Sequence, residues 1–131
     1  MTWYNTALQL LGDGGLDLGA GTFKIVFCTS AYTADLTDTG HDFRNDLAGE
    51  TATVTLAGCT WALRVFDCTS PVTITDPGSG TCTQMVLYKD IGTAATDNLI
   101  GHDIAATGLP ITFDGTDDSL TISDHLVKLG A

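Results

Sequence analysis

Basic side chains are scarce in this chain, and their scarcity narrows the kinds of partner that it can bind. The 131 residues include 5 Lys and Arg against 16 Asp and Glu, a formal net charge of −11 at pH 7. The cations are scattered, at Lys24, Arg44, Arg64, Lys89 and Lys128. Binding to a nucleic-acid backbone or an anionic membrane surface needs clustered cations. We therefore expect neither partner, and we interpret the acidity as favouring solubility or steering toward a basic protein surface.

Long apolar runs and targeting signals are also missing. No stretch approaches the ~20 apolar residues of a membrane-spanning helix. The N-terminal sequence MTWYNTALQLL has neither the basic segment nor the cleavage site of a secretory signal. We expect synthesis and folding in a cytoplasm.

The four cysteines, Cys28, Cys59, Cys68 and Cys82, form no CxxC pair. This spacing argues against a zinc ribbon and a thioredoxin-like site. Inert cysteines behave as small buried hydrophobic residues, so we expect four reduced structural cysteines. A bridge among Cys59, Cys68 and Cys82 is the alternative, because the first two flank one apolar strand pattern and the third begins another.

Catalytic signatures are absent from the sequence. No serine lies in a GxSxG elbow, and the glycine-rich stretches lack the strand–helix context of a phosphate-binding loop. His41, His102 and His125 each adjoin an aspartate, but neighbouring strand residues face opposite sides. A metal site would need His41, His102 and a carboxylate to converge. We expect surface histidines and no catalytic residue, cofactor or metal.

The acidic segment 114–118 offers carboxylates of the kind that bind calcium. Its glycine comes second and no distal glutamate follows, so it does not match an EF-hand. We expect a solvated hairpin loop between two strands.

The chain has the composition of one folded domain, which we expect to span residues 1–131. Hydrophobic residues make up 44% and charged residues 16%, unlike a disordered segment. Residues 3–11 place Trp3, Ala7 and Leu11 on one helical stripe, and the glycines of 12–15 end it. We expect this N-terminal helix or arm, residues 1–11, to dock on its own domain or on a partner subunit.

Strand patterns dominate the rest of the chain. Residues 22–29 predict a strand covered on both faces. Segment 30–50 is predicted to leave the sheet, with a short helix around 40–47 anchored by Phe43 and Leu47. Further short strands are predicted at 51–56, 60–66, 71–75, 82–88, 98–105, 111–114, 120–123 and 126–129. The sequence predicts a mainly β fold, a β-sandwich or barrel-like domain of about 7–9 short strands with a short N-terminal helix.

A series of short motifs runs along the chain, from Trp3–Asn5 through Thr22–Phe27 and Tyr88–Thr93 to Val127–Leu129. Together they resemble a family of small virion proteins of tailed bacteriophages. Typical members begin with WYN, continue with a TIKVALV-type strand and a YT-D loop, and later carry YKDTGT, LIGY-D and a terminal L-KL. The matching stretches here are Trp3–Asn5, Leu16–Leu18, Thr22–Phe27, Tyr32–Asp35, Tyr88–Thr93, Leu99–Asp103, Leu109–Pro110, Ser119–Ile122 and Val127–Leu129. The sequence departs from the family pattern at His102, at Ser123 and through residues 50–80.

The resemblance implies a non-enzymatic structural protein of the virion, and the first expectation is a capsid decoration (cement or minor capsid) protein on the outer face of the head that stabilises it. Its implied partners are the major capsid protein and other copies of itself, with a trimer favoured. A neck, tail or fibre-attachment component of the same virion is the alternative, and a small-ligand binder or enzyme is a third. Contact with a partner is predicted for Trp3, Tyr4, Phe43 and Leu47. Packing in the core is the competing interpretation for the first two.

Overall fold

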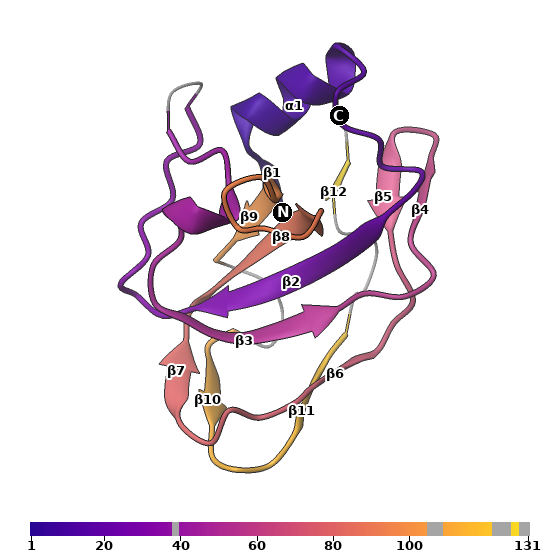
Figure 1. The fold of residues 1–131 in the computed structure, drawn as a ribbon. Helices are drawn as coiled ribbons and strands as arrows, with labels where there is room; N and C mark the ends of the chain where they lie inside the picture. Colours follow the sequence, from indigo (N-terminus) through magenta and orange to yellow (C-terminus); the bar gives the residue numbers. More distant parts are fainter. Residues whose placement is uncertain (38–39, 105–108, 122–126, 129–131) are drawn as a thin grey trace.

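The fold is built around one curved antiparallel sheet, shown by the computed structural model in Figure 1. The structure describes residues 1–37, 40–104, 109–121 and 127–128. The main sheet has five strands in the order β1-β9-β8-β2-β3. These strands are β1 (Thr2–Trp3), β9 (Asn98–Asp103), β8 (Gln84–Asp90), β2 (Thr22–Cys28) and β3 (Glu50–Thr55).

Three smaller antiparallel sheets lie to the right of the main sheet and below it in Figure 1. One has the order β12-β5-β4, and the other two pair β6 with β11 and β7 with β10. Their bounds are β4 (Thr60–Ala62), β5 (Val65–Asp67), β6 (Val72–Ile74), β7 (Gly80–Cys82), β10 (Ile111–Phe113), β11 (Asp118–Leu120) and β12 (Val127–Lys128). Buried side chains of the small sheets share one hydrophobic cluster with the main sheet, and the Phe66 ring lies 4.7 Å from that of Phe23.

Strands β2 and β8 form the centre of the molecule because both of their faces are apolar. Phe23, Ile25 and Phe27 point to one face of β2, and all three are buried. Val26 and Cys28 point to the opposite face and are equally buried. The predicted strand at 22–29, covered on both sides, is therefore confirmed.

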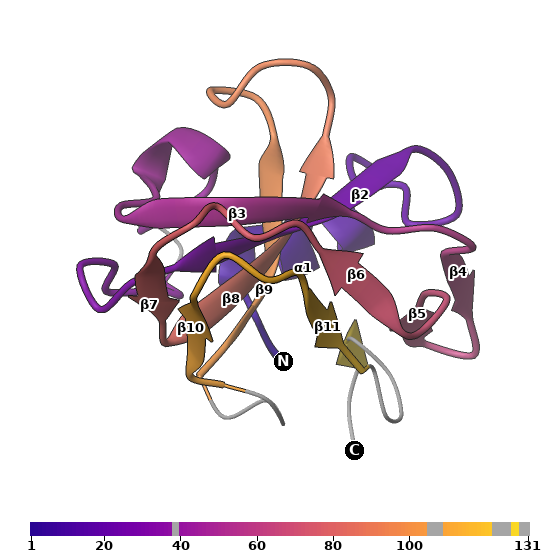
Figure 2. The same cartoon turned by 90° about the horizontal axis from the view of Figure 1, so that it is seen from below.

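The small sheets cover the face of Phe23, and the N-terminal helix and segment 30–50 cover the other. Helix α1 (Asn5–Gly12) lies across the top of Figure 1, with Ala7 fully buried. It is joined to segment 30–50 by hydrogen bonds from Asn5 N to Leu36 O (3.2 Å) and from Thr6 Oγ1 to Asp42 Oδ1 (2.5 Å). The described residues of the segment include the 3-10 turn η1 (Arg44–Asp46). Figure 2 shows the sheet from below.

Residues 72–82 and 111–120 run side by side as one long antiparallel pair interrupted in its middle. Ile74 lies opposite Asp118, and Gly80 lies opposite Phe113. The registers of the two strand pairs therefore differ by only one residue. Between them the two loops are tied by Asp76, whose Oδ2 accepts hydrogen bonds from Asp114 N and Gly115 N (both 2.9 Å). Desolvation alone would raise the pKa of Asp76, but hydrogen bonds from the backbone N–H groups of Gly78, Gly115, Asp114 and Thr116 together lower it.

The mainly β fold with a short N-terminal helix is confirmed, and several predicted elements change. Segment 114–118 is not a hairpin loop, because the strands on either side of it pair with β7 and β6 and not with each other. Trp3 belongs to strand β1, not to the helix, because Thr2 and Trp3 pair with His102 and Gly101. The predicted helix at 40–47 is reduced to η1.

The predicted strand at 60–66 is instead the β4–β5 hairpin, with its turn at Leu63 and Arg64. Strands β4 and β5 are short because the chain reverses there. Residue 105, at the end of the predicted strand 98–105, lies outside the described residues. So do the end of the predicted strand 120–123, both ends of that at 126–129, and His125.

Candidate functional site

The structure places the four predicted contact residues in two different environments. Trp3 and Tyr4 are buried, with 8% and 1% of their surface exposed. The Trp3 ring packs edge-on against Trp61 at 6.3 Å, which joins β1 to the β4–β5 hairpin. Phe43 and Leu47 are half-buried and flank η1. Core packing therefore accounts for the first two side chains in the isolated chain, and contact with a partner stays a prediction for all four.

Tyr4 begins a chain of hydrogen bonds that runs from the N-terminus of α1 into segment 30–50. The hydroxyls of Tyr4 and Tyr32 are 2.6 Å apart, and Tyr32 OH lies 3.0 Å from His41 Nδ1. Asp35 N also lies within hydrogen-bonding distance of His41 Nδ1 (3.3 Å), so this one ring nitrogen has both the Tyr32 hydroxyl and a backbone N–H as neighbours. Burial raises the pKa of Tyr32 to about 12. Burial also raises the pKa of Tyr4, so both phenols stay neutral at physiological pH and can hydrogen-bond to each other.

A second buried polar group, the side chain of Gln84 in β8, forms hydrogen bonds with the backbone at the start of segment 30–50. Its amide Nε2 donates to Tyr32 O (2.7 Å) and Thr29 O (3.1 Å). With both amide protons used, Oε1 is left to accept a hydrogen bond from His102 Nε2 at 2.8 Å. His102 is therefore the tautomer that carries its proton on Nε2. Sequence reasoning missed this residue, since a single glutamine beside an apolar run gives no signal.

Acidification is expected to weaken the fold through His102. Burial lowers the pKa of His102, although the charge of Asp103 acts in the opposite direction. The unfolded chain takes up its proton as the pH falls through about 6.5, before the folded protein does. Neutral His102 thus makes its full contribution to the free energy of unfolding above about pH 6.5. This contribution declines below that pH and becomes constant below the folded-state pKa of His102. Urea unfolding of the wild type and of His102→Asn at a series of pH values measures the free energy of unfolding of each protein. A difference between the two that does not change with pH would contradict the prediction.

Backbone contacts fasten the rest of segment 30–50 to the loop between β8 and β9. Arg44 N donates to Asp97 O (3.0 Å), and Asn45 N donates to Ala94 O (3.1 Å). The Arg44 guanidinium forms an ion pair with Glu50 (2.9 Å) and lies 5.2 Å from the centre of the Tyr88 ring. Segment 30–50 is thus a docked part of the domain.

Metal-binding groups do not gather in the part of the chain that the structure describes. No three His, Cys, Asp or Glu side chains there are placed to hold a metal ion. In the acidic segment 114–118, Asp114 Oδ1 accepts a hydrogen bond from Thr116 N (3.1 Å) and Asp117 Oδ1 accepts one from Asp76 N (3.0 Å). These carboxylates are used to shape the loops. No helix of the described residues is long and apolar enough to cross a membrane.

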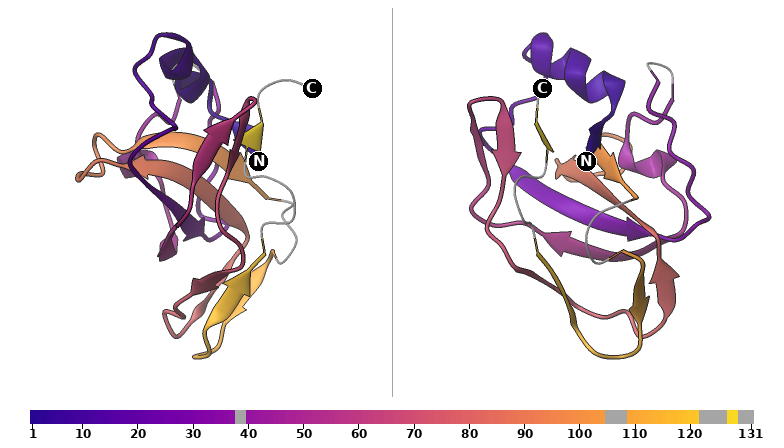
Figure 3. Two further views of the ribbon diagram at one scale, coloured as in Figure 1. Left: turned by 90° about the vertical axis from the view of Figure 1, so that its right-hand side faces the viewer. Right: turned by 180° about the vertical axis from the view of Figure 1, so that it is seen from behind.

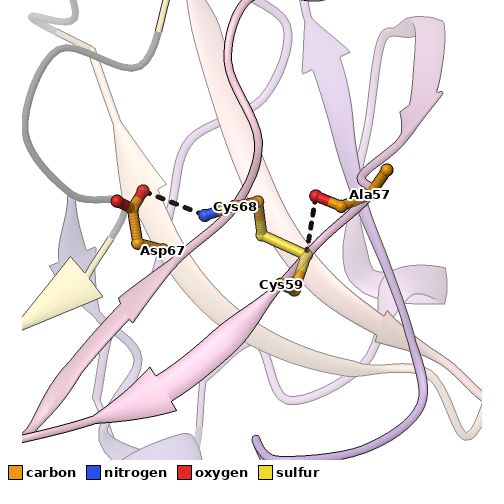
Figure 4. Close-up of a disulfide and its surroundings, with 4 residues drawn as sticks. All are labelled: Ala57, Cys59, Asp67 and Cys68. Carbon is orange, nitrogen blue, oxygen red and sulfur yellow. Dashed lines mark hydrogen bonds between the residues drawn. A yellow bond between two sulfur atoms is a disulfide. The ribbon is translucent and has the colours of Figure 1, made fainter.

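The expectation of four reduced cysteines is wrong for two of them. Cys59 and Cys68 form a disulfide across the base of the β4–β5 hairpin, with Cα atoms 4.0 Å apart (Figure 4). Cys28 and Cys82 are free and buried. Burial raises the pKa of the Cys28 thiol to about 12, which keeps it protonated and unreactive. The bridge forms because Thr60 pairs with Asp67, so that the next residue outward on each strand is also a neighbour.

The tip of the β4–β5 hairpin combines two unusual features. Leu63 and Arg64 both have positive φ, 51° and 67°, which is the requirement of a two-residue type I′ turn. Such turns favour Asn-Gly, because positive φ is costly for larger side chains. In addition, Leu63 is 94% exposed. Sequence analysis missed this feature because neither residue is a turn signal.

The sequence matches no known protein-family model, no curated protein and no solved structure.

Proposed function

We propose that the protein is a non-enzymatic structural component of a tailed-bacteriophage virion. In this role it is a capsid decoration protein that binds the outer face of the head and stabilises it. Its partners are the major capsid protein and other copies of itself. The observation that carries the proposal is the order of the family-like motifs along the whole chain, from Trp3–Asn5 to Val127–Leu129.

The positions of those motifs in the fold support the proposal. The first lies where β1 passes into α1, and Thr22–Phe27 makes up most of the central strand β2. Tyr32 is buried against Tyr4, and Leu99–Asp103 fills β9. Most motifs up to residue 103 therefore belong to the main sheet and to the layer on α1's side, whereas residues 119–120 and 127–128 lie in strands β11 and β12 of the small sheets. Region 50–80, where the sequence departs from the family pattern, supplies β3 and strands β4, β5 and β6 of the small sheets on the opposite face.

Physical requirements of the role agree with this architecture. A particle that persists outside a cell favours a compact β domain, and here a disulfide closes one hairpin. A net charge of −11 keeps copies soluble before they assemble. On a lattice of repeated sites, many individually weak contacts act together.

An icosahedral cryo-EM reconstruction of the parent virion tests the location. Density for the main sheet at repeated positions on the outside of the shell supports decoration. Matching density found only at the neck or tail, after symmetry is relaxed, would reject decoration in favour of a connector or tail role. Copy number per virion gives an independent measure, because decoration requires many copies.

Removal of the protein from the head is expected to lower its resistance to heat. Heads assembled without it should release their DNA at a lower temperature than complete heads, because contacts between neighbouring shell subunits are lost. A fluorescent DNA dye added during a temperature ramp measures release, and adding back purified protein is the matched control. Equal release temperatures for deficient and complete heads would contradict the stabilising role.

A further inference from the structure

The turn of the β4–β5 hairpin carries the most exposed of the large hydrophobic side chains that the structure describes. Leu63 is 94% exposed, compared with 65% for Ile104 and 58% for Ile91. Its neighbour Arg64 is exposed as well. Figures 1 and 3 show the turn at the end of the hairpin that is farther from β2 and β3. We call Leu63 and Arg64 the hairpin tip.

The two side chains of the hairpin tip are not used by the fold that the structure describes. At 94% exposure, Leu63 buries almost no apolar surface. The Arg64 guanidinium makes no ion pair or hydrogen bond with the described residues. Three other cations of the chain are each engaged, Lys24 with Asp90, Arg44 with Glu50 and Lys89 with Asp17 O. The tip is therefore available to a partner.

The backbone of the hairpin tip is also held in a conformation that leucine and arginine disfavour, with φ of 51° and 67°. The pairing of Ala62 with Val65 imposes a two-residue turn, and the Cys59–Cys68 disulfide closes the other end of the hairpin. Outliers that the surroundings enforce in this way are concentrated at functional sites. A tip that is fixed in advance loses little conformational entropy when it binds.

We propose that the hairpin tip inserts into an apolar pocket, with a carboxylate at its rim, on a partner protein of different sequence. A single protruding apolar side chain is complemented by a concave apolar surface, and the unpaired cation beside it by a carboxylate. A nucleic acid or an anionic membrane would need several clustered cations, and the tip has one. Against a second copy, the net charge of −11 on each chain is repulsive.

This inference rests on the proposed function only in taking the partner from the virion. It adds a contact surface outside the four residues for which contact was predicted, and it specifies the chemistry of the site that receives the tip. It applies equally to a partner in the head, the neck or the tail.

The test replaces both residues of the hairpin tip with the pair that a type I′ turn prefers, Leu63→Asn with Arg64→Gly. This variant removes the apolar side chain and the charge while favouring the native turn, so it should fold at least as well as the wild type. The probe is virus particles assembled without this protein, and cosedimentation measures binding of the purified oxidised protein to them. We expect the double variant to bind about 10- to 100-fold more weakly than the wild type, the effect of losing one buried leucine.

Reversing the charge of the hairpin tip tests the carboxylate at the rim separately. Arg64→Glu keeps Leu63 and should bind at least about 10-fold more weakly than the wild type, because repulsion replaces attraction. Raising the NaCl concentration from about 50 to about 300 mM should narrow this difference, since exposed charges are screened. Equal affinities of the two proteins at low salt would overturn the assignment of a carboxylate.

Ile91→Asn is the matched control, since Ile91 is also exposed and lies on the loop between β8 and β9, away from the hairpin (Figures 2 and 3). It should bind particles like the wild type. The proposal is overturned if the double variant binds as tightly as the wild type, or if the Ile91 variant loses as much affinity. Self-association of the wild type that the double variant lacks, seen in sedimentation equilibrium, would overturn it in favour of a second copy.

The particle experiment also separates this inference from the proposed function. A wild type that does not bind the particles at all overturns both. Binding that depends on the hairpin tip but is confined to the neck or tail rejects decoration of the head and supports the inference about the tip. Binding to the head that is unchanged in the double variant does the reverse.

Discussion

Replacing Gln84 with leucine is expected to destabilise the protein by about 3 kcal/mol or more, because several buried polar groups lose their partners together. Gln84 is 7% exposed and bonds to Thr29 O, Tyr32 O and His102 Nε2. Leucine fills a similar volume but satisfies none of them. The free energy of unfolding in urea measures the loss, and hydrogen exchange should show that segment 30–50 opens before the main sheet.

Gln9→Leu is the matched control for this change. Gln9 is exposed on α1, so the same substitution there removes no buried hydrogen bond. We expect it to alter stability by less than about 0.5 kcal/mol. Equal effects of the two substitutions, measured in dilute protein where copies are separate, would show that Gln84 does not hold the segment in place.

Loss of the Cys59–Cys68 disulfide is expected to cost about 2–3 kcal/mol. The two cysteines are 9 residues apart, and closing a loop of that size removes entropy chiefly from the unfolded chain. The doubly substituted Cys59→Ser, Cys68→Ser protein should therefore fold to the same structure and melt at a lower temperature. Differential scanning calorimetry measures the change.

Reductant provides the control for the disulfide prediction. Dithiothreitol should lower the melting temperature of the wild type to that of the double variant and leave the variant itself unchanged. The free thiols Cys28 and Cys82 are present in both proteins, so they cannot account for a difference. A wild type that melts at the same temperature with and without reductant would contradict the prediction.

Parts of the fold that depend on local pattern could be predicted from the sequence. Strand β2 was visible because its residues are apolar on both faces, and the glycines after residue 11 marked the end of α1. The break at Leu63–Arg64 was not visible, because the turn there is imposed by pairing and the disulfide and not by turn-forming residues. Trp3 was assigned to the helix for a related reason: its pairing with Gly101 depends on residues far along the chain.

The candidate site was harder to predict than the fold, since its members are brought together by tertiary structure. An aromatic pair such as Trp3 and Tyr4 looks the same in sequence whether it packs inside the domain or contacts a partner. Gln84 and His102 are 18 residues apart and meet because β8 and β9 are adjacent. The link between Cys59 and Cys68 likewise required the strand register, which spacing alone does not give.

The pairing of β1 with β9 has a consequence for the order in which the chain can fold during synthesis. Thr2 and Trp3 emerge first from the ribosome, yet their partners, His102 and Gly101, emerge about 100 residues later. Central strand β2 also waits for β8. Long-range pairings of this kind slow folding, because the chain must close large loops before it gains stabilising contacts. The N-terminal leucines therefore stay without their final neighbours until most of the protein has been made, the period in which premature association is most probable.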